Sequence, residues 1–154
     1  MSRTIWLLIF FFWTTAVWAD TAQKTFKVTA QITTGCLLGN GTGTPGADFG
    51  TLNFGSMSSL YSNVDVASSA GAGSIVVACT PGMAISLALD YGVNGGSAAQ
   101  RYMSNSTGNT LAYQLFQDAN RSTVWGTGAQ AYSVASFPNT TQTYTVYGRL
   151  FATN

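Results

Sequence analysis

The chain has 154 residues, of which 46% are hydrophobic and only 7% are charged, and its formal net charge is +1. It contains no histidine and no glutamate, which excludes Ser-His-Asp and Cys-His catalysis, and its two cysteines alone are too few for a tetrahedral metal site. It also lacks a surplus of Lys and Arg that could neutralise phosphates, so we expect no nucleic acid partner. The composition therefore predicts a protein that is not an enzyme and that carries no cofactor.

The first nineteen residues differ from the rest. Arg3 precedes an apolar run over 5–17, and small residues occupy the −3 and −1 positions of a cleavage site after Ala19. This order is typical of a secretory signal peptide, and the run is shorter than the about 20 apolar residues of a membrane-spanning helix. We expect residues 1–19 to be a signal peptide rather than an uncleaved anchor, and residues 20–154 to form a single domain.

Alternation of apolar and polar residues with a period of two dominates the rest of the chain, and helical periodicity is hard to find. The first such run places Phe26, Val28, Ala30 and Ile32 on one face. The segments expected to be strands are 26–32, 49–54, 74–79, 85–89, 111–115, 132–135 and 144–148. Between them lie stretches rich in Gly, Ser, Asn and Pro. Many short strands joined by such turns predict an all-β sandwich or barrel.

Cys36 and Cys79 are the two cysteines of the chain. An even number of cysteines in an exported protein favours a disulfide, since the compartment is oxidising. The alternative is a pair of buried free thiols.

Aromatic residues recur at strand spacing over 91–151, where they would serve packing within a core or between neighbouring strands. A sugar-binding face is the alternative role. We expect Tyr91, Tyr102 and Trp125 to be the most exposed of them.

Five segments in a particular order resemble the spore coat protein U family, whose members include subunits of archaic chaperone–usher pili. They are FKVTAQITTGC, DFGTLNFG, SIVVACTPG, LAYQLFQDANRSTVWG and YTVYGRLFA, and they run from Phe26 almost to the end of the chain. Cys36 and Cys79 match the positions of the family's disulfide. Tyr113, Asp118, Arg121 and Trp125-Gly126 match a hairpin of the family.

The resemblance implies an incomplete immunoglobulin-like sandwich whose apolar groove is filled by donor-strand exchange. A periplasmic chaperone would fill the groove first, and the N-terminal segment of a neighbouring pilin subunit would replace it at the outer-membrane usher. Phe26, Val28, Ala30 and Ile32 suit such a donor strand, and they equally suit the subunit's own first strand. The implied location is the periplasm and then the surface of a Gram-negative bacterium.

The segment YTVYGRLFATN predicts a last strand, and family members usually continue beyond it into a further strand. We expect that the chain is truncated after Asn154, that the further strand lies in another domain, that this version is defective, or that another molecule supplies the strand. The leading function is a structural pilus subunit that supports adhesion and biofilm formation. The alternatives are a tip adhesin or carbohydrate-binding domain, and a spore or cell-surface coat protein.

Overall fold

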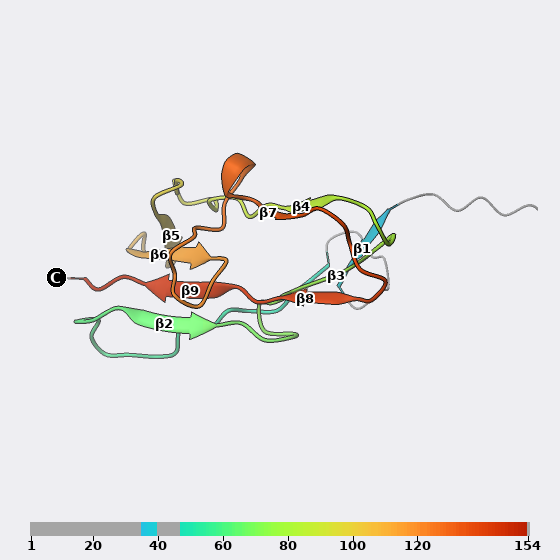
Figure 1. Ribbon diagram of the computed structural model, residues 1–154. Coiled ribbons are helices and arrows are strands. Elements are labelled where there is room, and N and C mark those ends of the chain that lie inside the picture. Colours follow the sequence, from blue (N-terminus) through green and yellow to red (C-terminus); the bar gives the residue numbers. More distant parts are fainter. Residues whose placement is uncertain (1–34, 40–46, 154) are drawn as a thin grey trace, which may run out of the picture. The chain divides into compact units, whose positions relative to one another are not determined.

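A computed structural model describes residues 35–39 and 47–153 of the chain (Figure 1). The predicted signal peptide over 1–19 and the alternating residues Phe26, Val28, Ala30 and Ile32 lie outside the described residues. The strands within the described part are β1 (Cys36–Leu38), β2 (Val64–Ala67), β3 (Ile75–Cys79), β4 (Ile85–Leu87), β5 (Arg101–Ser104), β6 (Thr110–Phe116), β7 (Tyr132–Val134), β8 (Gln142–Tyr144) and β9 (Tyr147–Leu150). A single 3₁₀ turn, η1 (Gly128–Gln130), accompanies them, and no helix among the described residues is long and apolar enough to cross a membrane.

Two sheets are joined end to end into one layer. Their strand orders are β1-β3-β8 and β2-β9-β6-β5, and all pairs are antiparallel. The chain passes from β8 directly into β9, and at this junction the Ser68 amide donates to the Val146 carbonyl at 2.9 Å. The Val146 amide in turn donates to Ser68 Oγ at 2.7 Å. Figure 1 shows β8 and β9 following one another, with β3 and β2 running beside them.

A second, smaller layer consists of β4 and β7, paired from Ile85↔Val134 to Leu87↔Tyr132. Their apolar side chains pack against a buried cluster of Ile75, Val77, Trp125, Phe137 and Val146. Burial of one such large apolar side chain contributes about 1.5–3 kcal/mol, so this cluster is the main source of stability in the layer contact. The arrangement confirms the predicted all-β sandwich.

Segment 49–54, which the alternation pattern predicts to be a strand, contains none. Glycines with positive φ stand in and after it, at Gly50 (81°) and Gly55 (86°), and each follows an Asx turn. Asp48 Oδ1 accepts the Gly50 amide and Asn53 Oδ1 accepts the Gly55 amide, both at 2.8 Å. These turns bend the backbone away from ladder geometry, while the alternating apolar side chains keep their role in packing.

The last strand of the described chain has a partner strand on each side. β9 pairs with β2 on one side, from Ala67↔Tyr147 to Val64↔Leu150, and with β6 on the other. Within the described part the open edges belong to other strands, among them β4, which pairs with β7 alone.

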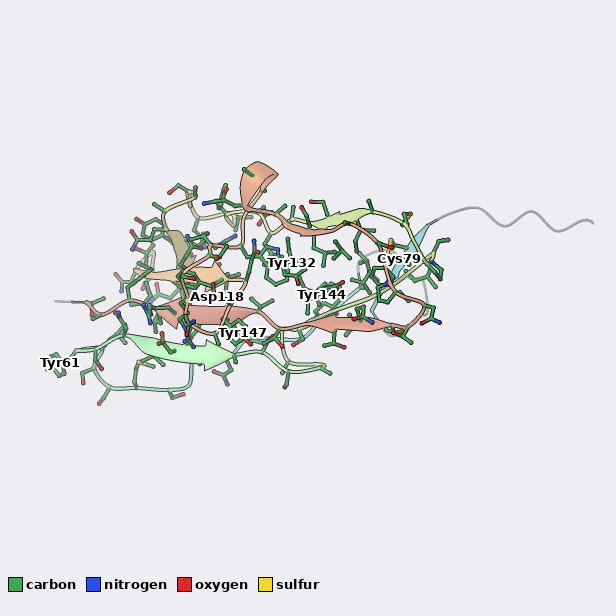
Figure 2. The ribbon with its side chains drawn as sticks, in the orientation of Figure 1. Tyr61, Cys79, Asp118, Tyr132, Tyr144 and Tyr147 are labelled. Carbon is green, nitrogen blue, oxygen red and sulfur yellow. A yellow bond between two sulfur atoms is a disulfide. The ribbon has the colours of Figure 1, made fainter. Side chains whose placement is uncertain are left out.

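The two cysteines are joined by a disulfide between β1 and β3. Cys36 and Cys79 stand directly opposite one another in the register of the two strands (Figure 2). The bond attaches β1 to the layer by a covalent link in addition to its three register positions. No free cysteine occurs in the chain.

Candidate functional site

An apolar groove of about 350 Å³ lies against β3, β5 and β6. Side chains of β3, β5 and β6 form one wall, and Leu89, two residues after β4, lies opposite them. The remaining wall comes from the strandless segment 49–54. The lining residues are Phe49, Gly50, Leu52, Phe54, Gly73, Ile75, Leu89, Met103, Tyr113, Leu115 and Val146.

Glycines allow segment 49–54 to lie against the sheet. A Cβ at Gly148 in β9 would come within 2.8 Å of Leu52 Cδ2 and 2.9 Å of Phe54 Cζ, so both side chains use the space that this glycine leaves. Gly50 combines its positive φ with a backbone so close to Gly71 that a Cβ would collide with the carbonyl oxygen there. Phe54 also packs edge-on against Tyr113, with ring centroids 6.3 Å apart. The segment therefore covers the sheet through apolar side chains rather than through a hydrogen-bonded ladder.

β5, which contributes Met103 to the groove, pairs with β6 alone, so its other edge has no strand partner among the described residues. Leu89 continues from β4, and its amide donates to the Gly126 carbonyl at 3.1 Å, on the side of β7. An unpaired strand edge next to an apolar groove offers both main-chain hydrogen bonds and side-chain pockets to an extended peptide.

Arg101 holds the chain segment after β4 in place through buried hydrogen bonds. It is only 1% exposed, and its guanidinium donates to the carbonyls of Asp90 (2.8 Å), Leu89 (3.1 Å) and Trp125 (2.7 Å). It also donates to Gln114 Oε1 and lies over the ring of Tyr91, 5.2 Å from its centroid. Burial lowers the pKa of Arg101 from its usual value. Because a buried charge is costly unless its hydrogen bonds are satisfied, these acceptors hold the chain after β4 in one place.

The four carboxylates in the described part are used in turns and in one ion-pair cluster. Asp48 and Asp90 accept the amides two residues ahead of them. Asp118 accepts from Ser122 and Thr123 in the hairpin after β6, and the Thr123 amide is the main reason that its pKa is lowered. Asp65 pairs with Arg149 at 2.7 Å and Arg121 at 3.3 Å; its pKa is lowered, chiefly by the hydrogen bond from Arg149. Each of these carboxylates has a structural task.

Metal ligands do not converge within residues 35–39 and 47–153: no three His, Cys, Asp or Glu side chains gather there. What the described residues do bring together is an apolar groove, an open strand edge and a buried arginine that positions both. Such an arrangement can bind an extended peptide chain.

Sequence reasoning located part of this region. The hairpin predicted to contain Asp118 and Arg121 is present, and Arg121 adopts a positive φ of 57° in its turn. The expected exposure of Trp125 is wrong, because its side chain is 1% exposed and its Nε1 donates to the Leu87 carbonyl at 2.7 Å. Leu89 belongs to the alternating segment 85–89, whereas Arg101 carries no pattern that would single it out, since its role arises from contacts between distant segments.

A comparison with models of protein families identifies the family of this chain. The model of the spore coat protein U domain matches residues 22–154. The chain belongs to this family. Domains of the spore coat protein U family are known from subunits of chaperone–usher pili, which gives the chain a general fimbrial role. A search of the curated proteins found no match.

Proposed function

We propose that this spore coat protein U domain is a structural subunit of a surface pilus, assembled by the chaperone–usher pathway through donor-strand exchange. The observation that carries the proposal is the apolar groove to which β5, an edge strand of the larger sheet, contributes Met103. A strand added at the open edge of β5 would bury its alternate side chains in the groove and pair its backbone with β5. The groove is lined by no charged side chain, so its occupant is an apolar strand face.

The proposed occupant in the fibre is the N-terminal segment of the next subunit. Phe26, Val28, Ala30 and Ile32 alternate with polar residues, so one face of an extended segment is apolar. Before assembly, a strand of a periplasmic chaperone fills the same groove, and the exchange takes place at the outer-membrane usher. The pilus then stands on the surface of a Gram-negative cell, where it supports adhesion and biofilm formation.

Disulfide trapping tests the groove and its occupant directly. The native cysteines already form a disulfide, so a new pair can be introduced without a competing thiol. Ile32→Cys is combined, one variant at a time, with Leu52→Cys, Leu89→Cys or Met103→Cys in the groove. In assembled fibres at least one pair is expected to give a ladder of covalent oligomers on a non-reducing gel.

Val93→Cys is the matched control, because Val93 is 96% exposed and does not line the groove. It should give no ladder with Ile32→Cys. An intrachain link in the isolated subunit would mean that the segment is the subunit's own first strand. Assembled fibres with no cross-link at any groove position would contradict donor-strand exchange at this site.

A further inference from the structure

A second hollow, of about 230 Å³, differs from the groove in its chemistry. Its walls come from β7, β8, β9 and the residue that follows β6, and it shares no lining residue with the groove. β7 pairs with β4 alone and β8 with β3 alone, so each has one edge without a described partner strand. Figure 2 shows Tyr132 and Tyr144 in the space between β7 and β8, with Tyr147 near the start of β9.

Aromatic rings form a connected row in this hollow. The Tyr132 ring lies 5.5 Å from the ring of Trp125 and 5.2 Å from the ring of Tyr144, measured between centroids. Trp125 is fully buried beneath, whereas the three tyrosines at 132, 144 and 147 are half-buried. The tyrosine rings are thus held by packing while part of each remains accessible. Rings fixed in this way bind an apolar ligand face at a small cost in side-chain entropy.

Polar groups without a partner among the described residues line the hollow beside these rings. The hydroxyls of Tyr132, Tyr144 and Tyr147 make no hydrogen bond to any residue of the described chain, nor do those of Thr143 and Thr145. Gln117 donates from Nε2 to the carbonyls of Gln130 at 2.9 Å and Val124 at 3.4 Å, which fixes its carboxamide and leaves Oε1 as an acceptor. Burial raises the pKa of Tyr144, so this hydroxyl stays protonated and able to donate at neutral pH.

We propose that this hollow binds one ring of a neutral saccharide. A sugar ring presents an apolar C–H face, which suits the tyrosine rings, and a rim of hydroxyls, which suits acceptors and donors such as Gln117 Oε1 and the Thr143 and Thr145 hydroxyls. No charged side chain lines the hollow, which disfavours an anionic ligand. Its volume is below the roughly 300–1,000 Å³ of cavities for drug-sized ligands, so it accommodates one ring or the end of a chain.

Saturation-transfer NMR tests this site with the methyl glycosides of glucose, galactose, mannose and N-acetylglucosamine. The exported full chain is measured in complex with its chaperone. A sample of the chaperone alone serves as the blank. At least one glycoside is expected to give a saturable signal. Tyr144→Phe and Tyr147→Phe keep each ring and remove one hydroxyl, and each should weaken binding about fivefold, the effect of losing one hydrogen bond.

Tyr61→Phe is the matched control, because Tyr61 is 87% exposed and does not line the hollow. It should leave binding unchanged, and an unchanged Trp125 emission maximum in each variant shows that the fold is intact. The absence of a saturable signal from all four glycosides would overturn the proposal. Binding that survives the combined Tyr144→Phe and Tyr147→Phe change at full strength would also overturn it, because the sugar would then sit elsewhere.

Discussion

The two halves of the large layer differ in what covers them. Over β1-β3-β8 lies a paired layer, β4 and β7, and the side chains between them include the fully buried Trp125 and Phe137. Over β2-β9-β6-β5 lies segment 49–54, which has apolar side chains but no strand, and the groove remains beside it. We refer to these regions as the closed half and the open half.

The closed half and the open half differ in backbone hydrogen bonding as well as in apolar burial. In the closed half, a strand layer buries side chains while its backbone groups pair with one another. In the open half, Leu52 and Phe54 cover Gly148, but the backbone of their segment forms no ladder. An added strand at the edge of β5 would supply the ladder that this half lacks. The open half is therefore where a partner can act on stability, and the following predictions test that division.

Trp125→Ala in the closed half should have the largest effect. The side chain is 1% exposed and its Nε1 hydrogen bond to Leu87 would also be lost, so the free energy of unfolding should fall by about 3–5 kcal/mol. Urea unfolding followed by far-UV circular dichroism measures the loss, since the variant lacks the fluorophore.

Leu52→Ala is the counterpart in the open half. Leu52 is half-buried, so its truncation should cost about 1–2 kcal/mol in the subunit without a partner strand. The same change should weaken binding of a synthetic peptide spanning residues 26–32, whereas peptide binding per folded molecule should be unchanged in Trp125→Ala. Equal effects of both variants on stability and on peptide binding would remove the distinction between the halves.

Reduction of the Cys36–Cys79 disulfide should have an effect comparable to that of Trp125→Ala. The bond closes a loop with a sequence separation of 43, and the chain-entropy model gives about 4 kcal/mol for a loop of this size. Oxidised protein should show no titratable thiol under denaturing conditions and a lower urea midpoint after reduction. The Cys36→Ala, Cys79→Ala double variant should match the reduced protein; a midpoint unchanged by reduction would contradict the prediction.

The sequence predicts the closed half better than the open half. Alternation locates β3, β4 and β7 in the closed half, because their apolar faces meet a partner layer, and it locates β6 alone as a whole strand in the open half. Alternation wrongly predicts a strand over 49–54, because two Asx turns and glycines with positive φ bend the backbone there. It also misses β1, whose Leu37 and Leu38 are both exposed, and β5, which begins with a buried arginine. The burial of Arg101 depends on carbonyls 11 to 24 residues away, which no local pattern records.

Arg101→Met should destabilise the contact of β5 with Trp125 and with the segment after β4. The change leaves the carbonyls of Leu89, Asp90 and Trp125 without their donor, and the expected loss is about 3 kcal/mol. Arg101→Lys should recover little of it, because a single ammonium cannot reproduce the fork of the guanidinium. Arg149→Met is the control: this arginine pairs with Asp65 at a partly exposed site, so its loss should cost less than about 1 kcal/mol. A comparable loss in both variants would contradict the role given to Arg101.

The smallest effect on stability is expected from Asp118. This residue lies in the hairpin that leads from β6 in the open half to Trp125 in the closed half. Its pKa is lowered from 3.8, first by the hydrogen bond from the Thr123 amide. A carboxyl whose folded-state pKa lies below its unfolded value stabilises the fold above the unfolded value, and this contribution is lost as the pH falls through the folded pKa. The thermal midpoint should therefore decrease as the pH is lowered from 5 to 2. Asp118→Asn should lower the midpoint slightly at pH 6 and reduce its decrease in acid, so that the two curves approach one another as the pH falls. Midpoint curves that stay parallel over this range would show that Asp118 does not contribute to the acid sensitivity of the hairpin.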